Sequence, residues 1–362
     1  MTKFTRRLQK IGNSTLVSLP KEWVDSHNLK KGGRVELETV GRDSISLSVS
    51  EGDGAEARAT ADLVISYPLP AEENIVADTT GAYLLGYDVI RIESGDSGAI
   101  PVGDREEIRN SMRRLVGMEI IEEDASHIEM QFLLDAATLS PAKILKRMSS
   151  IAVGMCGDVT RGLVSDDRSN LQTIPNRDIE VNRQYFLLVR LIRSSLADRR
   201  LAGAFNLGSI DILDYRVAAN LLENAGDSVV ELAGLVAGSS LSSGQSQMIF
   251  EAVQGFERTA SLAIDAFTAP DRRLAIEAIS LHRRMQERLA GLRTMQPGPG
   301  GRAAAARNAA AAAAGAAADG REGGSGGQLP VDFIDVIHMY EKIARSWADV
   351  ADLVKPIYDD KA

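Results

Sequence analysis

Two carboxylates lie four residues apart in the segment Leu222–Ala233, at Glu223 and Asp227. On a helix, this spacing places both side chains on one face, about one turn apart. Carboxylate oxygens placed in this way can share a hard or borderline cation. The alternative is an ordinary solvated helix face, although like charges at this spacing are mildly destabilising without a partner. The acid pair therefore indicates either a metal site or an exposed acidic face.

A second chemistry lies in the uneven distribution of charge along the chain. The whole chain of 362 residues carries a formal net charge of -9. Residues 1–50 hold nine basic and five acidic side chains, a net charge of +4, which leaves -13 for residues 51–362. A small basic head on a large acidic body indicates an anionic partner for the head. A solvated basic surface without a partner is the alternative.

The sequence lacks the motifs of the common enzyme classes. It contains no G-x-x-x-x-G-K-[ST] and no G-x-G-x-x-G after a predicted strand. Its one G-x-S-x-G match, at residues 323–327, lies in a Gly/Ala/Arg-rich stretch and not in a strand-to-helix turn, where a hydrolase would need it. Its single cysteine, Cys156, excludes a disulfide scaffold and a cysteine-held metal cluster within this chain. The four histidines do not have the spacing of a zinc hydrolase. We therefore expect no enzymatic activity, and a metal-dependent enzyme of another kind stays as a minor alternative.

The basic segment has the pattern of a small β-rich domain. A helix is expected at Lys21–His27, and strands are expected at Thr5–Ile11, Thr15–Leu19 and Arg42–Val49. Residues Leu29–Leu37 are expected to form a glycine turn that leads into a further strand. A unit of about fifty residues buries too little apolar surface to be stable alone. We therefore expect it to intertwine with a second copy.

The stretch KIGNSTLVSLPKEWVDSHNLKKGGRVEL (Lys10–Leu37) resembles the SpoVT/AbrB swapped-hairpin family of bacterial and archaeal transition-state regulators and antitoxins. The similarity extends over residues 3–50. It implies a homodimer whose interleaved hairpins hold basic strands and loops against DNA. The positions that match the DNA-facing surface of the family are Arg6, Arg7, Lys10 and Asn13. Basic side chains there would neutralise phosphates, and an arginine fork could read guanine edges. Some such domains only dimerise, so that alternative stays open.

The middle of the chain predicts a compact α/β piece after a polar linker at residues 51–61. We expect strands at Asp62–Tyr67 and Asp88–Glu93, helices at Ala71–Leu85 and Asp104–Val116, and a hairpin at Glu119–Glu122 and His127–Leu133. No combination of side chains in this piece is typical of an active site, and the sequence assigns it no role.

From Ser140 onward, apolar residues recur at helical spacing, and the pattern occurs twice. A shift of 104 residues aligns Asp178 with His282, and a shift of 118 aligns Glu223 with Glu341. The longer shift comes from a Gly/Ala/Arg-rich insertion at 297–328, which we expect to be disordered. The predicted helices are Ala142–Val164, Asp178–Leu196 and Ile212–Val236 in the first round, and Gln247–Phe267, Asp271–Leu292 and Val331–Tyr358 in the second.

The helical part resembles the PhoU family of phosphate-uptake and phosphate-signalling regulators. The resemblance is carried by RDIEVN (Arg177–Asn182) and LENAGDSVVELA (Leu222–Ala233), with YEKIARSWADVA (Tyr340–Ala351) as a diverged second copy. It extends over residues 140–357. Joined to the AbrB-like head, the chain is similar to the archaeal type of PhoU-related regulator.

The PhoU resemblance implies metal ions bound on the bundle by E/D-x-x-x-D pairs. In the second repeat, Arg345 replaces the second acid and would repel a cation or pair with Glu341, which leaves Glu341 and His282 as doubtful ligands. The implied cofactor is a divalent or trivalent metal ion such as Fe, Zn or Mg. The positions that match in the first repeat are Asp178, Asn182, Glu223 and Asp227.

We therefore expect a multidomain α+β chain. Its predicted parts are a small swapped-hairpin β domain at 1–50, a small α/β domain at 62–135, and an all-α pair of three-helix bundles. The bundles are expected at 140–236 and at 245–358, the second with the disordered insertion 297–328.

The two resemblances together imply a DNA-binding transcription regulator of phosphate uptake or homeostasis. The alternative is a soluble accessory protein that docks on a phosphate transporter or its regulatory components, with a head that serves only for dimerisation. The start of the sequence has no apolar signal-peptide core, and no stretch is long and apolar enough to span a bilayer. We therefore expect a cytoplasmic homodimer or higher oligomer.

Overall fold

The structure is a computed structural model that describes residues 4–40, 44–49, 62–95, 98–165, 168–294 and 331–354. Contacts between Cα atoms divide the chain into two compact units, Met1–Thr60 and Ala61–Ala362. We call the first unit the head. The second unit contains a sheet region, at residues 62–132, and a helical body, at residues 141–354.

The head consists of two separate hairpins and a short helix. Strands β1 (Gln9–Ile11) and β2 (Ser14–Leu16) form the first hairpin around Gly12, whose φ of 60° suits glycine. Helix α1 (Lys21–Ser26) follows Pro20, and strands β3 (Val35–Val40) and β4 (Ser44–Val49) form the second hairpin. The order of these elements agrees with the expected swapped-hairpin domain, although β1 is shorter than the predicted strand.

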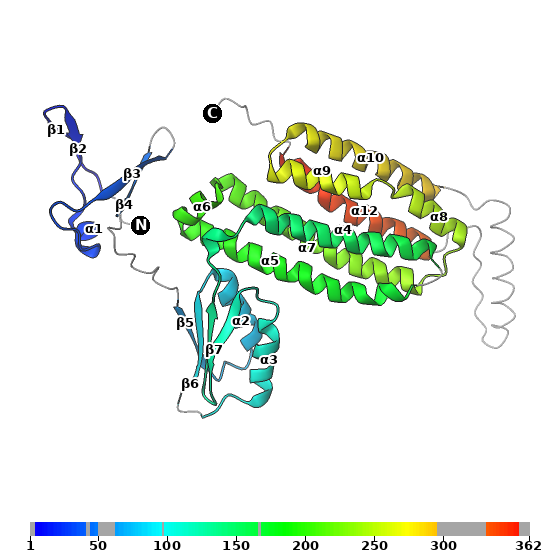
Figure 1. Cartoon of the computed structure of the whole chain (residues 1–362), viewed down its shortest axis with the longest axis horizontal. Coiled ribbons are helices and arrows are strands. Elements are labelled where there is room, and N and C mark those ends of the chain that lie inside the picture. The colour runs from blue at the N-terminus through cyan, green and yellow to red at the C-terminus, as the bar shows by residue number, and fades with distance from the viewer. Residues whose placement is uncertain are drawn as a thin grey trace. The chain divides into compact units, whose positions relative to one another are not determined.

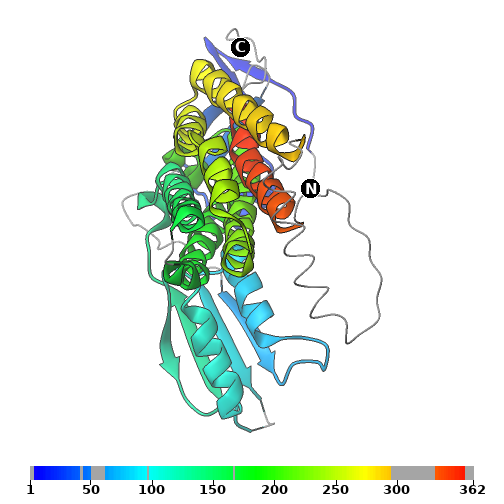
Figure 2. The same cartoon turned by 90° about the vertical axis from the view of Figure 1, so that its right-hand side faces the viewer.

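The sheet region is a four-stranded sheet with two helices. Its strands lie in the order β5-β6-β8-β7. Strands β5 and β6 are parallel, whereas β8 is antiparallel to both β6 and β7. Figures 1 and 2 both show α2 and α3 on the same side of this sheet. The bounds are β5 Asp62–Tyr67, α2 Ile75–Leu85, β6 Val89–Ser94, α3 Val102–Met112, β7 Met118–Glu123 and β8 His127–Phe132.

In the described residues, the helical body contains five of the six long helices that the sequence predicts, the sixth in two pieces, and additional short helices. Ser140 begins the first of them, since its hydroxyl accepts from the backbone N–H of Lys143 and Pro141 occupies the first helical position. The bounds are α4 Pro141–Val164, α5 Ile174–Ala197, α6 Arg199–Phe205, α7 Ser209–Gly238, α8 Ser243–Ala252, α9 Phe256–Thr268, α10 Arg272–Thr294 and α12 Val331–Val354, with 3₁₀ turns at Ala136–Thr138 and Ser169–Thr173.

Two sets of three helices pack against each other in the body. Helices α4, α5 and α7 contact one another, as do α9, α10 and α12 (Figure 1). The two sets meet where α12 lies against α7 and where α4 lies against α8 and α9. Trp347 on α12 is fully buried at this junction, and its indole N–H donates to Ser149 Oγ on α4 at 2.9 Å. The predicted fold class, with its pair of three-helix bundles, is therefore confirmed.

One predicted helix is wrong in its continuity. The sequence predicts a single helix over Gln247–Phe267, whereas the structure has α8 and α9 with a break at Val253–Gly255. Gly255 has a φ of 95°, in the left-handed region that a continuous helix excludes. Arg288 on α10 donates to the carbonyl oxygen of Gln254 at 2.8 Å and of Glu251 at 3.3 Å. These bonds satisfy carbonyl groups that the break leaves without helical partners.

Arg190 on α5 joins the helical body to the sheet region. Its guanidinium donates to the carbonyl oxygens of Tyr83 and Tyr87 at 2.9 and 2.8 Å, and to Asp88 Oδ1 at 2.6 Å. The same group lies over the Phe132 ring, 4.0 Å from its centroid. Since all these partners belong to the sheet region, one buried cation links the two parts of the second unit, in addition to the packing of α2 against α5.

Several predictions fall on residues outside the described ranges. These are the linker at 51–61, the start of the strand at Arg42, the insertion at 297–328 and the end of the last helix beyond Val354. In the ranges that the structure describes, no helix has the length and apolar character needed to cross a membrane.

Candidate functional site

Three carboxylates approach one another where α5 and α7 pack together. Asp178 lies on α5, whereas Glu223 and Asp227 lie one turn apart on α7. Their charges act on one another, because Asp227 raises the pKa of Asp178 and both aspartates raise the pKa of Glu223. We call these three residues the acid cluster. The structure therefore brings together three of the residues that the PhoU resemblance selects.

Asp178 is the most deeply placed member of the acid cluster. Its side chain is 9% exposed, and its Oδ1 atom has no hydrogen-bond partner. A Cβ atom at Gly226 would lie 2.7 Å from this oxygen, so only glycine leaves room for it. The pKa of Asp178 is raised to about 6, chiefly because burial disfavours the charged form and secondly because of the charge on Asp227. A hydrogen bond from Asn182 Nδ2 to Asp178 Oδ2, at 2.9 Å, opposes this shift.

Glu223 is the half-buried member of the cluster. Burial is the largest cause of its raised pKa, followed by the charges of Asp227 and Asp178, while Arg216 opposes the shift. Arg216 itself lies over the ring of Tyr185, 5.4 Å from the centroid. The cluster thus holds more negative charge than its neighbouring cation balances.

The acid cluster suits a hard cation by its chemistry. Three carboxylates supply charged oxygens, and the orphaned Oδ1 of Asp178 lacks a positive partner. In the part of the chain that the structure describes, no three His, Cys, Asp or Glu side chains meet closely enough to hold a metal ion. Asn182 turns its amide nitrogen, not its oxygen, toward Asp178. A bound cation would therefore require these side chains to turn toward a common point.

The corresponding position in the second repeat carries His282 on α10. Like Asp178, this side chain is buried and has an unpartnered atom, here Nδ1. Burial lowers the pKa of His282, and the positive charge of Arg345 lowers it further, while Asp352 opposes the shift. The two repeats therefore share a buried, incompletely satisfied polar group but differ in the charge that surrounds it.

Glu341, the other candidate ligand in the second repeat, makes different contacts. Its carboxylate lies 3.2 Å from Arg293 Nη2 and 3.9 Å from His338 Nδ1. Arg345 lies close enough to His282 to affect its pKa, as the sequence predicts for a position unfavourable to a cation. Of the second-repeat positions that the resemblance selects, only Glu341 is an acid. Two other acids of α12 lie nearby, since Asp352 raises the pKa of both His282 and Asp349, but here Arg345 supplies a positive charge that opposes a cation.

The four candidate DNA-binding residues lie in and beside the first hairpin of the head. Arg6, Arg7, Lys10 and Asn13 are all exposed, and Arg6 lies over the Phe4 ring, 5.7 Å from its centroid. Among the residues described, Arg6, Arg7 and Lys10 form no ion pair. Their charges are therefore available to an anionic ligand.

The apolar side chains of the head are equally exposed. No described side chain of the head is buried, and Leu8 is 74% exposed. The other large apolar side chains that are exposed in the head are Phe4, Ile11, Leu16, Val17, Leu37 and Ile45.

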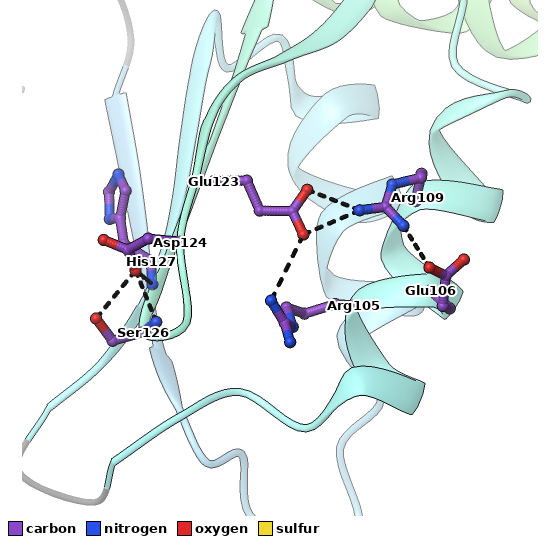
Figure 3. Close-up of polar contacts among 7 residues, drawn as sticks. All are labelled: Arg105, Glu106, Arg109, Glu123, Asp124, Ser126 and His127. Atoms are coloured by element: carbon purple, nitrogen blue, oxygen red, sulfur yellow. Dashed lines mark hydrogen bonds and ion pairs between the residues drawn. The ribbon is translucent and has the colours of Figure 1, made fainter.

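Asp124, Ser126 and His127 lie together in the sheet region and have the residue types of a catalytic triad (Figure 3). Asp124 Oδ1 accepts from the backbone N–H groups of Ser126 and His127 at 2.7 and 2.8 Å, and from Ser126 Oγ at 3.1 Å. These bonds lower the pKa of Asp124 and form the turn between β7 and β8. Ser126 donates to the carboxylate and not to a histidine base, so the arrangement of a catalytic triad is absent from these residues.

Two residues beside the acid cluster, Gly226 and Arg216, were not predicted from the sequence. Gly226 lies within a helix, where glycine costs about 1 kcal/mol relative to alanine, and that cost was the available signal. Arg216 gives no such signal, because its effect on Glu223 depends on how α7 is oriented in the bundle.

Two segments of the chain match family models. Residues 8–48 match the model described as "Antidote-toxin recognition MazE, bacterial antitoxin", and residues 145–236 match the PhoU domain. The second match covers the three helices around the acid cluster, α4, α5 and α7. A MazE/AbrB-type head and a PhoU-domain body are therefore supported.

Among solved structures, the chain is similar to the crystal structure of PhoU from Pseudomonas aeruginosa. The identity is 14%, the TM-score is 0.36, and the match covers 59% of this chain and 93% of that one. No curated protein matches the chain.

Proposed function

We propose that the chain is a DNA-binding regulator of phosphate uptake or homeostasis. In this proposal, the MazE/AbrB-type head contacts DNA and the PhoU-type body responds to phosphate status. The observation that carries the proposal is the exposed basic surface of Arg6, Arg7 and Lys10 in a domain that matches the MazE antitoxin model and resembles the SpoVT/AbrB regulators. The sequence gives this head a net charge of +4 on an otherwise acidic chain.

Dimerisation through the head is part of the proposal. A single head leaves Leu8 and six other large apolar side chains exposed, and a second copy that interleaves its hairpins would cover them. Burial of apolar surface contributes roughly 25 cal/mol per Å², so the uncovered head has little to stabilise it. Two copies would also present two basic surfaces to one duplex.

A metal ion at the acid cluster is the proposed link between the body and its signal. Asp178, Glu223 and Asp227 would hold the ion, and Asn182 would keep Asp178 in place or add its own oxygen. A divalent or trivalent ion would supply the positive charge that the cluster lacks. The alternative for the body is docking on a phosphate transporter, for which the cluster would be one part of a contact surface.

The proposal is tested by measuring affinity for the chain's own upstream DNA across a range of salt concentrations. Loss of one phosphate contact lowers the magnitude of the slope of log K against log salt by about 0.9. We expect this change for Arg7→Ala and for Lys10→Ala. Lys21→Ala on α1 is the matched control, since this exposed lysine of the same head lies outside the first hairpin.

Unchanged DNA affinity in both variants would remove DNA binding through this surface. A head that dimerises without binding DNA would instead favour the accessory role at a phosphate transporter.

A further inference from the structure

The two edges of the four-stranded sheet are built differently. Edge strand β7 carries three acids (Glu119, Glu122 and Glu123), and its pairing with β8 is irregular between Ile120 and Glu122. Charges and bulges on an edge strand prevent its pairing with another chain. This edge therefore has the features of one that remains unpaired.

The opposite edge, strand β5, lacks these features. All six residues from Asp62 to Tyr67 pair with β6 in an uninterrupted register, and the only charged residue is Asp62 at the first position. Val64 lies at the middle of the strand and is 49% exposed. In the part of the sheet that the structure describes, no strand pairs with the outer side of β5. An edge strand with regular pairing, little charge and apolar side chains favours the addition of another strand.

We propose that β5 pairs antiparallel with β5 of a second copy of this chain. The two sheets would then form one continuous sheet across a twofold axis. Residues that face each other in antiparallel strands lie on the same face, so the register that centres on Val64 sets it opposite its own copy. The same register sets Asp62 opposite Ser66 and Leu63 opposite Ile65, without opposing like charges.

Dimerisation of the heads would bring β5 of a second chain close to β5 of the first, so this inference rests on the head dimer of the proposed function. Residues 50–61 connect β4 to β5, and these twelve residues can extend over at most about 45 Å. A dimer of heads therefore keeps the two β5 strands within a limited distance. Tethering through short linkers gives one strand an effective concentration of roughly millimolar order around the other. A strand contact that is too weak to form between separate chains can then form. A second copy is thus favoured over an unrelated protein.

The test is disulfide formation in the full-length chain carrying Val64→Cys. Opposed residues of antiparallel strands have Cβ atoms about 4.5–5.5 Å apart, close to the separation that a disulfide requires. We expect mild oxidation to link two copies through Cys at position 64. The matched control is Ser66→Cys, which is exposed on the same face of the same strand. In the proposed register, the two copies of residue 66 are offset by four residues, about 13 Å along the strands.

We expect the covalent dimer to form at least about tenfold faster with Val64→Cys than with Ser66→Cys, because tethering acts on both thiols alike and only the proposed register brings the position 64 thiols within disulfide distance. Equal rates for the two variants would overturn the proposed pairing. Protection of the position 64 thiol from alkylation without any cross-link would also overturn it, because another occupant would then cover the strand. Native Cys156 is buried and does not compete.

Hydrogen exchange of the native chain gives a second readout that needs no cysteine. We expect the backbone amides of β5 to exchange more slowly in the native chain than in the Val64→Lys variant. The variant places two like charges opposite each other at the twofold axis and so opposes the pairing. Equal exchange in the two proteins would contradict the pairing.

The test separates this inference from the proposed function. A chain that sediments as a dimer and binds DNA, yet forms no cross-link at position 64, overturns the strand pairing alone. A chain that cross-links at position 64 but binds no DNA supports the strand pairing and removes the proposed function. A monomeric chain without a cross-link overturns both the strand pairing and the head dimer.

Discussion

Arg190 Nη2 lies 2.6 Å from Asp88 Oδ1, and this ion pair crosses from the helical body to the sheet region. The arginine side chain is buried, and it also donates to two backbone carbonyl groups. A buried charge that loses its partner costs about 3–5 kcal/mol. Arg190 is therefore the polar link in a contact that also includes the packing of α2 against α5.

We expect Arg190→Ala to destabilise the contact between the sheet region and the body by about 3 kcal/mol, since it leaves Asp88 and two carbonyl groups without their partner. Calorimetry should show separate transitions for the two parts. Arg91→Ala is the control, because its partly exposed ion pairs with Asp62 and Glu129 lie within the sheet, so their loss should leave the contact with the body unchanged. A single unchanged transition in Arg190→Ala would contradict the role given to this residue.

The raised pKa of Asp178 predicts a pH-dependent stability in metal-free protein. The folded pKa of about 6 lies above the ordinary value, so the stabilisation from its protonated form is complete below about pH 4 and is lost as the pH rises through 6. At pH 7.5 or so, Asp178→Asn should raise the stability by on the order of 2 kcal/mol. Thermal unfolding at several pH values in the presence of a chelator measures this difference. Equal melting temperatures of the native chain and Asp178→Asn at neutral pH would show that the buried carboxylate does not destabilise the fold.

Metal binding by the chain should depend on the acid cluster. Elemental analysis of purified protein should detect metal in the native chain and not in the double variant Glu223→Gln plus Asp227→Asn. Glu231→Gln is the control, because Glu231 lies on the same helix but is exposed near Lys342, 3.8 Å from its Nζ. Equal metal content in the native and double-variant proteins would show that the acid pair is only a solvated face.

Cys156 should be inert in the folded protein. Its thiol is fully buried on α4, and burial raises its pKa to about 12, so almost none of it is thiolate at neutral pH. Iodoacetamide should label the chain in denaturant and leave it unlabelled under native conditions, as measured by mass spectrometry. Rapid native labelling would indicate that the junction of the two helix sets opens readily.

Local patterns were sufficient to predict most elements of the fold. The strand predicted at Asp62–Tyr67 coincides with β5, and the helix predicted at Ala142–Val164 differs from α4 by one residue. Both are marked by strong periodicity and by turn or capping residues at their ends. The break at Gly255 was missed because apolar spacing continues on both sides of it, and a single glycine within such a pattern is usually tolerated.

The sites depended on information that periodicity does not contain. The acid pair Glu223 and Asp227 is visible as a spacing, but the approach of Asp178 from α5 depends on how two helices pack. Arg190 lies in an apolar run of α5, and its partners are about a hundred residues earlier in the chain. A buried cation of this kind cannot be distinguished from an exposed one until its partners are placed.

The exposed apolar side chains of the head have a consequence for gene dosage. In the proposed head dimer, a stable head forms only when two chains associate, so the amount of stable head depends on the abundance of the protein. Where most heads are unpaired, doubling the rate of synthesis raises the number of paired heads by about fourfold, because pairing is second order in the chain. In the proposed regulator, expression level would thus itself be an input, and modest changes in copy number would be amplified before any ligand reaches the helical body.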